Sequence, residues 1–113
     1  MITIDAKDKT LGRVASAAAK ALIGKHSAAF AKNVVAVEAV KIVNASHVRL
    51  TGTKAQNKEY VRYSGYPGGQ KKETYEMLVA RRGQEEALRR AILGMLPKNR
   101  LQKPRMKLLT IEK

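Results

Sequence analysis

The stretch ITIDAKDKTLGRVASAAAKALIG, residues 2–24, decides the fold of this chain. Its start alternates isoleucine with polar residues, which predicts a short strand over residues 2–5, and residues 7–9 suit a turn. Thr10 suits a helix N-cap and Gly24 the position just after the last helical turn. Between them the apolar residues recur at helical spacing. We therefore predict an amphipathic helix to about residue 23, with one apolar stripe formed by Leu11, Val14, Ala15, Ala18 and Leu22.

The valine-rich region that follows completes a strand–helix–strand unit. Residues 34–51 are rich in β-branched side chains, and two strand segments are predicted there, one around Val40 and Ile42 and one around Val48 and Leu50. The order strand, helix, strand favours a parallel sheet. Residues 108–111 predict a last strand that returns to the same sheet.

The second half of the chain combines a polar region with two helices. Residues 54–72 contain few apolar side chains, and we predict a projecting β-hairpin or a long loop. Helical spacing recurs over about residues 74–82 and 84–96, separated by Gly83 and ended by Pro97. In the second helix two glutamates each precede an arginine by four residues, a spacing that stabilises a helix. The segment over residues 98–107 is strongly basic.

The charge of the chain indicates a polyanionic partner. Lys and Arg number 23 against 9 acidic residues, which gives a net charge of +14 and an isoelectric point near 10.4. Such a surface repels itself unless a negative partner covers it. The excess is spread over several segments, and no single helix concentrates it as a DNA-recognition helix would. Folded RNA, which is recognised through phosphates, 2′-hydroxyls and shape, fits this dispersed pattern better.

The motifs of the common enzyme and membrane classes are missing. There is no cysteine, so neither a disulfide nor a thiolate metal ligand exists. The Gly24-Lys25 pair lacks the rest of a P-loop, and no GxGxxG follows a strand. His26 and His47 have no partner at metal-ligand spacing. We expect no enzyme activity, cofactor, metal or small-molecule substrate. No apolar run approaches the about 20 residues of a membrane span, so no membrane partner is expected.

Several motifs in order resemble the family of bacterial large-subunit ribosomal proteins numbered thirteen. They are DKTLGRVAS (8–16), GKH (24–26), IVNASHVRLTG (42–52), KEYVRYSGYPGG (58–69), MLVARR (77–82) and ILGMLPKNRL (92–101). The resemblance implies one domain over residues 1–113, a three-layer α/β/α structure around a mostly parallel four-stranded sheet. It also implies a non-catalytic protein that binds large-subunit rRNA, joins early in subunit assembly and contacts neighbouring ribosomal proteins. Between residues 28 and 40, AAFAKNVVAVEAV replaces a segment that is usually more polar in the family.

The residues expected to contact rRNA lie in several segments. In the tip of the 54–72 region we expect Tyr66 to stack or pack and the glycines to let backbone approach RNA closely. The full set is Lys9, Thr10, Arg13, Lys25, His26, Lys54, Lys58, Arg62, Tyr63, Tyr66, Gly68, Gly69, Lys71, Lys72, Arg81, Arg82, Arg89, Arg90, Lys98, Arg100, Lys103, Arg105 and Lys107.

Two other functions fit the same surface. A free-standing RNA-binding regulator would use it on mRNA, and an α/β RNA-modifying enzyme would add a small-molecule pocket and catalytic residues. The expected location is a cytoplasmic ribosome, with an organellar ribosome as the alternative.

Overall fold

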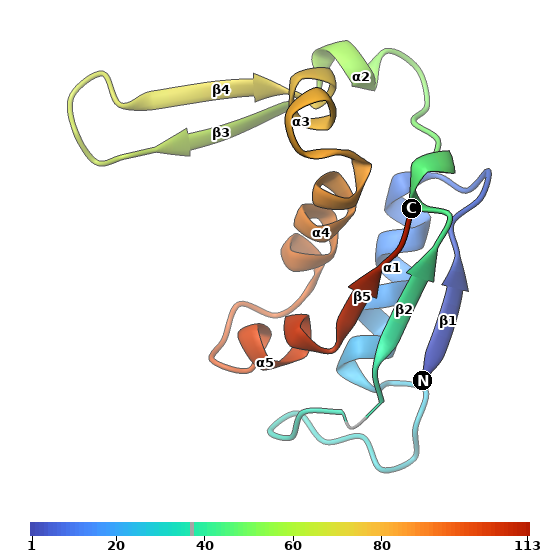
Figure 1. Cartoon of the computed structure of the whole chain (residues 1–113). Coiled ribbons are helices and arrows are strands. Elements are labelled where there is room, and N and C mark those ends of the chain that lie inside the picture. The colour runs from blue at the N-terminus through green and yellow to red at the C-terminus, as the bar shows by residue number, and fades with distance from the viewer. Residues whose placement is uncertain (37) are drawn as a thin grey trace.

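The computed structural model describes residues 1–36 and 38–113, so Val37 of the valine-rich segment lies outside the described residues. The opening unit is as predicted, with strand β1 (Ile2–Asp5), helix α1 (Leu11–Ile23) and strand β2 (Val40–Val43) (Figure 1). Strands β1 and β2 pair in parallel, from Ile2 opposite Val40 to Asp5 opposite Val43. Gly24 ends α1 in a left-handed conformation, and its N–H donates to the carbonyls of Lys20 and Ala21.

The parallel sheet has three strands in the order β1-β2-β5, so the prediction of a four-stranded sheet was wrong. The last strand, β5 (Leu109–Ile111), pairs with β2 as expected. The missing strand is the one predicted around Val48 and Leu50, where the structure has one bridge between Thr10 and Arg49. This pairing cannot extend because the chain after Thr10 already coils into α1 and uses its backbone groups there. Before it, the 3₁₀ turn η1 (Ala45–His47) bends the chain away from β2.

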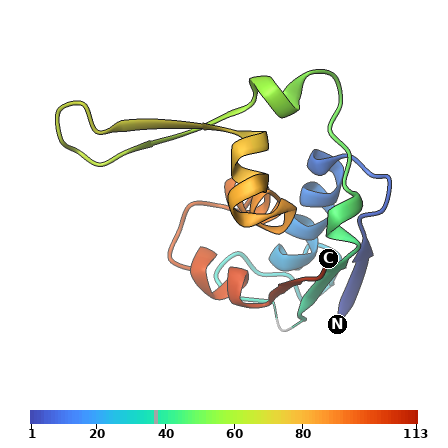
Figure 2. The same ribbon diagram turned by 45° about the horizontal axis from the view of Figure 1, so that its top comes forward.

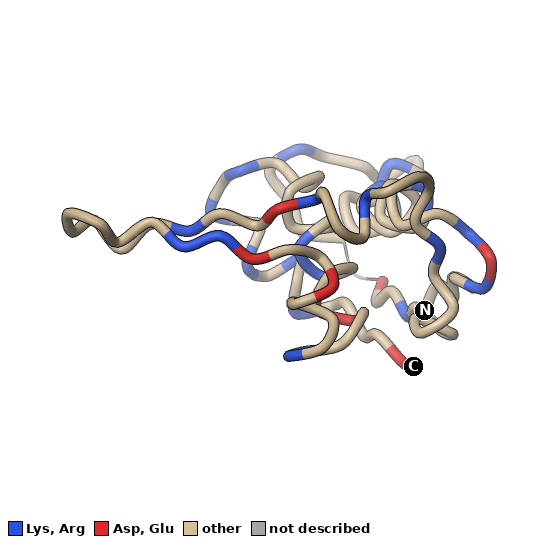
Figure 3. Tube along the Cα trace, turned by 90° about the horizontal axis from the view of Figure 1, so that it is seen from above, with Lys and Arg blue, Asp and Glu red and all other residues tan. Residues whose placement is uncertain are grey.

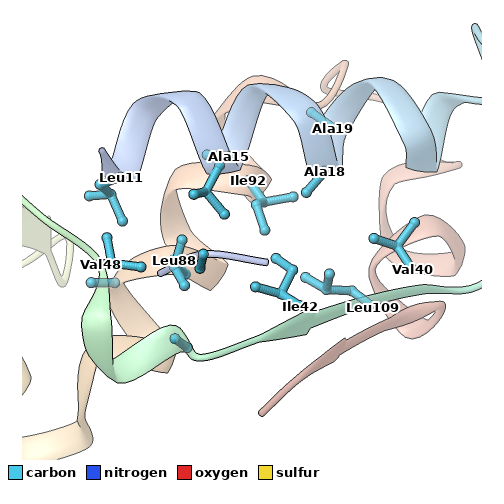
Figure 4. Close-up of a cluster of buried hydrophobic side chains, with 14 of the residues drawn as sticks. Leu11, Ala15, Ala18, Ala19, Val40, Ile42, Val48, Leu88, Ile92 and Leu109 are labelled. Atoms are coloured by element: carbon cyan, nitrogen blue, oxygen red, sulfur yellow. The ribbon is translucent and has the colours of Figure 1, made fainter. Parts of the chain in front are cut away.

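The helices cover one face of the sheet, which makes the body two-layered where three layers were expected. Val40, Ile42 and Leu109 point toward α1 and are buried (Figure 4). The opposite face carries Thr3, Asp5 and Thr110, which are all exposed. It also carries Lys41, whose Nζ lies 2.7 Å from Oε1 of Glu112.

The region 54–72 contains the hairpin of our first alternative, preceded by a short helix that we did not predict, α2 (Lys54–Asn57). Strands β3 (Glu59–Tyr63) and β4 (Gln70–Thr74) pair antiparallel and extend away from the body (Figures 1 and 2). The helices α3 (Tyr75–Arg82) and α4 (Gln84–Met95) match the prediction within one residue. Thr74 caps α3 by accepting a hydrogen bond from the N–H of Met77. A further short helix, α5 (Gln102–Lys107), lies in the basic segment and precedes β5.

The core is built mainly between α1, α4 and the sheet. Helix α1 contributes its predicted stripe, and α4 contributes Leu88 and Ile92, both fully buried (Figure 4). Seven of the 19 buried apolar residues are alanines, so the helices pack closely while few large side chains fill the interior. Met95, in the last turn of α4, is 44% exposed. Ala87, in the first half of the same helix, is fully buried.

Candidate nucleic-acid interface

Most of the positive charge of the chain has no counter-charge within the fold. Among the described residues, three of the 23 Lys and Arg side chains form ion pairs with carboxylates: Lys41, Arg81 and Arg90. The remaining cations lie along the hairpin and around the body (Figure 3). Because like charges at this density repel each other, the surface is suited to a polyanion.

The hairpin arm, which we define as residues 59–74, carries different chemistry on its two faces. Arg62 lies directly opposite Lys71, so the two side chains share one face. Val61 and Tyr63 point to the other face and are 54% and 66% exposed. Two like charges in opposite positions destabilise a strand pair. An anion bound between Arg62 and Lys71 would remove that repulsion.

The tip of the hairpin arm is a tight turn shaped by its glycines. Gly68 has a φ of +71°, a conformation that side-chain-bearing residues rarely adopt. The N–H of Gly69 donates to the carbonyl of Tyr66 at 2.9 Å. A Cβ added at Gly69 would overlap Oγ of Ser64 and lie 3.0 Å from that carbonyl oxygen. The turn therefore holds Tyr66, 74% exposed, at the far end of the arm.

The base of the arm is fastened to the helices by one ion pair. Glu73 accepts two hydrogen bonds from Arg81, each 2.8 Å long. These bonds lower the pKa of Glu73 below its ordinary value and raise that of Arg81. Arg81 is thus paired within the fold, whereas its equally exposed neighbour Arg82 forms no ion pair among the described residues.

Tyr60 links the arm to a second basic surface. Its ring centroid lies 5.7 Å from Nζ of Lys58 and 5.3 Å from Cζ of Arg90, within the range of cation–π interactions. Burial raises the pKa of the Tyr60 hydroxyl. Arg90 also bonds Glu86 at 3.2 Å, as the four-residue spacing predicted.

This second surface is a groove between the start of α1 and the end of α4, which we call the α1–α4 groove. It has a volume of about 540 Å³ and brings together residues that are distant in the sequence. Five of our predicted contact residues line it, namely Thr10, Arg13, Lys54, Lys58 and Arg90. Arg49 also lines it, and our sequence analysis missed this residue. The sequence contains little evidence for a contact role of Arg49, because a single arginine within an expected strand does not show which face of the strand it occupies.

The other predicted residues occupy separate places. Lys25 and His26 lie at the opposite end of α1, about 20 Å along the helix from the groove. Nε2 of His26 lies 3.1 Å from Oε2 of Glu38. Arg105 is 1% exposed, so its side chain does not reach the surface, and we leave it out of the interface. The remaining ones are exposed on the helices and loops: Lys9, Arg89, Lys98, Arg100, Lys103 and Lys107.

Two further structural facts concern other types of site. Across residues 1–36 and 38–113, no three His, Cys, Asp or Glu side chains gather where they could hold a metal ion. Within the same residues, no helix has the length and apolarity needed to cross a bilayer.

Comparison with known proteins identifies the family. The family model described as "Ribosomal protein L13" matches residues 1–111. This chain belongs to the ribosomal protein L13 family. Among its L13 relatives, one from Symbiobacterium thermophilum is 52% identical over 87% of this chain and 68% of the relative. Another, from Beutenbergia cavernae, is 49% identical over 96% of this chain and 73% of the relative. Both are named "Large ribosomal subunit protein uL13".

The L13 match confirms the resemblance found in the motifs and covers every surface described above. The hairpin arm, the α1–α4 groove and the basic segment before β5 all lie within residues 1–111. The family description is that of a ribosomal protein, which agrees with the expectation from the sequence.

Proposed function

We propose that this chain is a structural constituent of the large ribosomal subunit, which binds large-subunit rRNA and helps to organise it early in assembly. The family membership and the names of the relatives support the subunit assignment. The chain would act as one domain within the ribosome, in contact with neighbouring ribosomal proteins.

The observation that carries the rRNA-binding part of the proposal is the pair of Arg62 and Lys71 on the hairpin arm. They are directly opposite each other and exposed, and neither forms an ion pair with a carboxylate among the described residues, although the charge of Arg62 also acts on Glu73. A two-stranded hairpin is only marginally stable in water by itself, so a repulsive pair in its middle is a disadvantage for the free protein. A phosphate of rRNA between the two side chains turns this repulsion into two favourable contacts.

The arm supplies the geometry for this contact. It extends from the body, so both of its faces are reachable (Figure 2). Lys72 and Tyr63 lie on the other face of the arm from Arg62 and Lys71, and Tyr66 lies at the tip. The aromatic rings are suited to stacking on unpaired bases, as aromatic side chains do in many RNA-binding proteins.

The test is the salt dependence of binding to an in vitro transcript of bacterial large-subunit rRNA. The double variant Arg62→Gln/Lys71→Gln removes two phosphate contacts, so the slope of log K against log salt should become shallower by about 1.4–1.8. The control variant Lys20→Gln/Lys113→Gln removes the same charge from exposed sites outside the predicted interface, and its slope should change less.

Two results would contradict the proposal. One is binding of the wild-type protein that does not weaken with salt, and the other is an equal change of slope in both double variants. A separate sedimentation experiment tests the assignment to the subunit. Tagged wild-type protein should co-sediment with large subunits in near-stoichiometric amounts, whereas a free-standing regulator would remain in the lighter fractions.

A further inference from the structure

Two glycines lie inside helices where the fold gives no reason for them. Gly12 is in the first turn of α1 and Gly94 is in the last turn of α4. Neither has a positive φ, and a Cβ added at either would meet no atom of the described residues within 4 Å. Glycine within a helix is less stable than alanine. Neither backbone conformation nor packing among the described residues therefore accounts for the missing side chains.

Both glycines line the same cavity, the α1–α4 groove. Both contribute bare backbone to its lining, and five cationic side chains line it as well: Arg13, Arg49, Lys54, Lys58 and Arg90. Among the described residues, no carboxylate lines the groove, and Arg90 is the one of the five cations that pairs with a carboxylate, that of Glu86. A groove with this charge, and with bare backbone at one position of each helix, has the chemistry to hold a chain of anionic groups in close contact with the helices.

The groove is also longer than a small ligand would need, because a second depression adjoins it. A neighbouring depression of about 500 Å³ shares Arg90 and Gly94 with it and adds Lys98 and Gln102. The cations therefore follow a path from the start of α1 past the end of α4. A nucleoside triphosphate offers the same phosphate chemistry over a shorter span, so the length of the path favours a polynucleotide backbone.

We infer that the α1–α4 groove holds consecutive phosphates of an RNA backbone, and that Gly12 and Gly94 are glycines because the ribose-phosphate chain lies against them. The inference rests on the proposed function and assigns a site within it. The start of α1 adds to the attraction, because its first turn carries no acidic residue and the Thr10 side chain makes no capping bond.

The variants Gly12→Ala and Gly94→Ala separate this role from a structural one. Each should raise the melting temperature of the free protein, by up to about 4 °C, because alanine is the better helix former. Each should nevertheless weaken binding to the large-subunit rRNA transcript. The loss of one phosphate contact should make the slope of log K against log salt shallower by about 0.7–0.9. Over the tenfold range from 0.1 M to 1 M salt, this change of slope corresponds to a factor of about six in affinity.

Controls on the same elements make the outcome decisive. Ala17→Gly, on the exposed side of α1, should lower the melting temperature and leave the RNA affinity unchanged. Arg49→Gln should weaken binding and reduce the slope as the glycine variants do, because it removes a cation from the groove. Wild-type affinity and slope in Gly12→Ala and Gly94→Ala would overturn the inference.

The same experiments distinguish this failure from failure of the proposed function. If the glycine variants bind normally while Arg62→Gln/Lys71→Gln changes the slope, RNA binding stands and the groove is not part of it. A final experiment measures the melting temperature in millimolar ATP. If ATP raises the melting temperature of the wild-type protein but not that of Gly12→Ala, the groove takes a free nucleotide and the RNA-backbone assignment is wrong.

Discussion

Replacing Arg105 by methionine should stabilise the isolated protein. The Arg105 side chain is 1% exposed, and its Nε has no hydrogen-bond partner in the part of the chain that the structure describes. No carboxylate of the described residues pairs with it either, so a positive charge lies inside the body uncompensated. A buried donor without a partner costs about 1–3 kcal/mol, and more when it is charged. Methionine keeps most of the apolar stem and removes the guanidinium.

The expected gain is about 1–3 kcal/mol of unfolding free energy, reduced by the small cavity that the shorter side chain leaves. For a chain of 113 residues, the entropy of unfolding is about 0.24 kcal/mol per degree, so each kcal/mol gained raises the melting temperature by about 4 °C. We therefore expect an increase of roughly 4–12 °C in a calorimetric scan of the free protein.

Two variants serve as controls for Arg105→Met. Arg105→Lys retains a buried charge and should give no gain. Arg100→Met removes an exposed arginine just before the same helix and should change stability by less than about 0.5 kcal/mol. The reasoning is refuted if Arg105→Met lowers the melting temperature while Arg100→Met leaves it unchanged, because the guanidinium would then contribute favourably to the native state.

Three further changes test the core, the base of the arm and its tip. Leu88→Ala, at a fully buried position, should destabilise the protein by about 2–5 kcal/mol in urea titrations. Leu93→Ala, at a position 41% exposed in the same helix, should cost clearly less. Because Arg81 lowers the pKa of Glu73, the ion pair stabilises the fold at pH values above the ordinary glutamate pKa of 4.5. Its contribution disappears as the pH falls through the lower folded-state pKa. The stability difference between wild type and Glu73→Gln should therefore be constant near neutral pH and shrink under acid; a difference that grows in acid would contradict this. Valine at Gly68 and Gly69 should reduce incorporation into large subunits more than it lowers the melting temperature of the free protein, because the tip lies outside the core. If incorporation and melting temperature fell equally, the tip would serve only as a structural turn.

The sequence predicted the local structure well wherever a periodic pattern and its boundary residues agreed. Helix α1 lies between Thr10 and Gly24 as expected, and α3 and α4 are separated at Gly83. The hairpin arm followed from a polar region with a glycine-rich turn. The short helices α2 and α5 were missed because four to six residues are too few to show helical spacing.

The prediction of which cations lie close together in space was less complete for a physical reason. Runs of lysine and arginine show where charge lies along the chain, and these runs located the hairpin arm and the segment before β5. They do not show which cations converge in space. Arg49 joins the α1–α4 groove only because the chain passes beside the start of α1 there. Arg105 looks like its basic neighbours in the sequence and is nevertheless buried.

By itself, the sequence determined the family, the order of the main helices and strands and the excess of positive charge, because these depend on residue types and their spacing. The tertiary structure alone decided that the sheet has three strands, that its helices lie on one face and that five separated cations surround one groove. Those features depend on which backbone groups remain free to pair and which segments meet in space. Spacing along the chain does not contain that information.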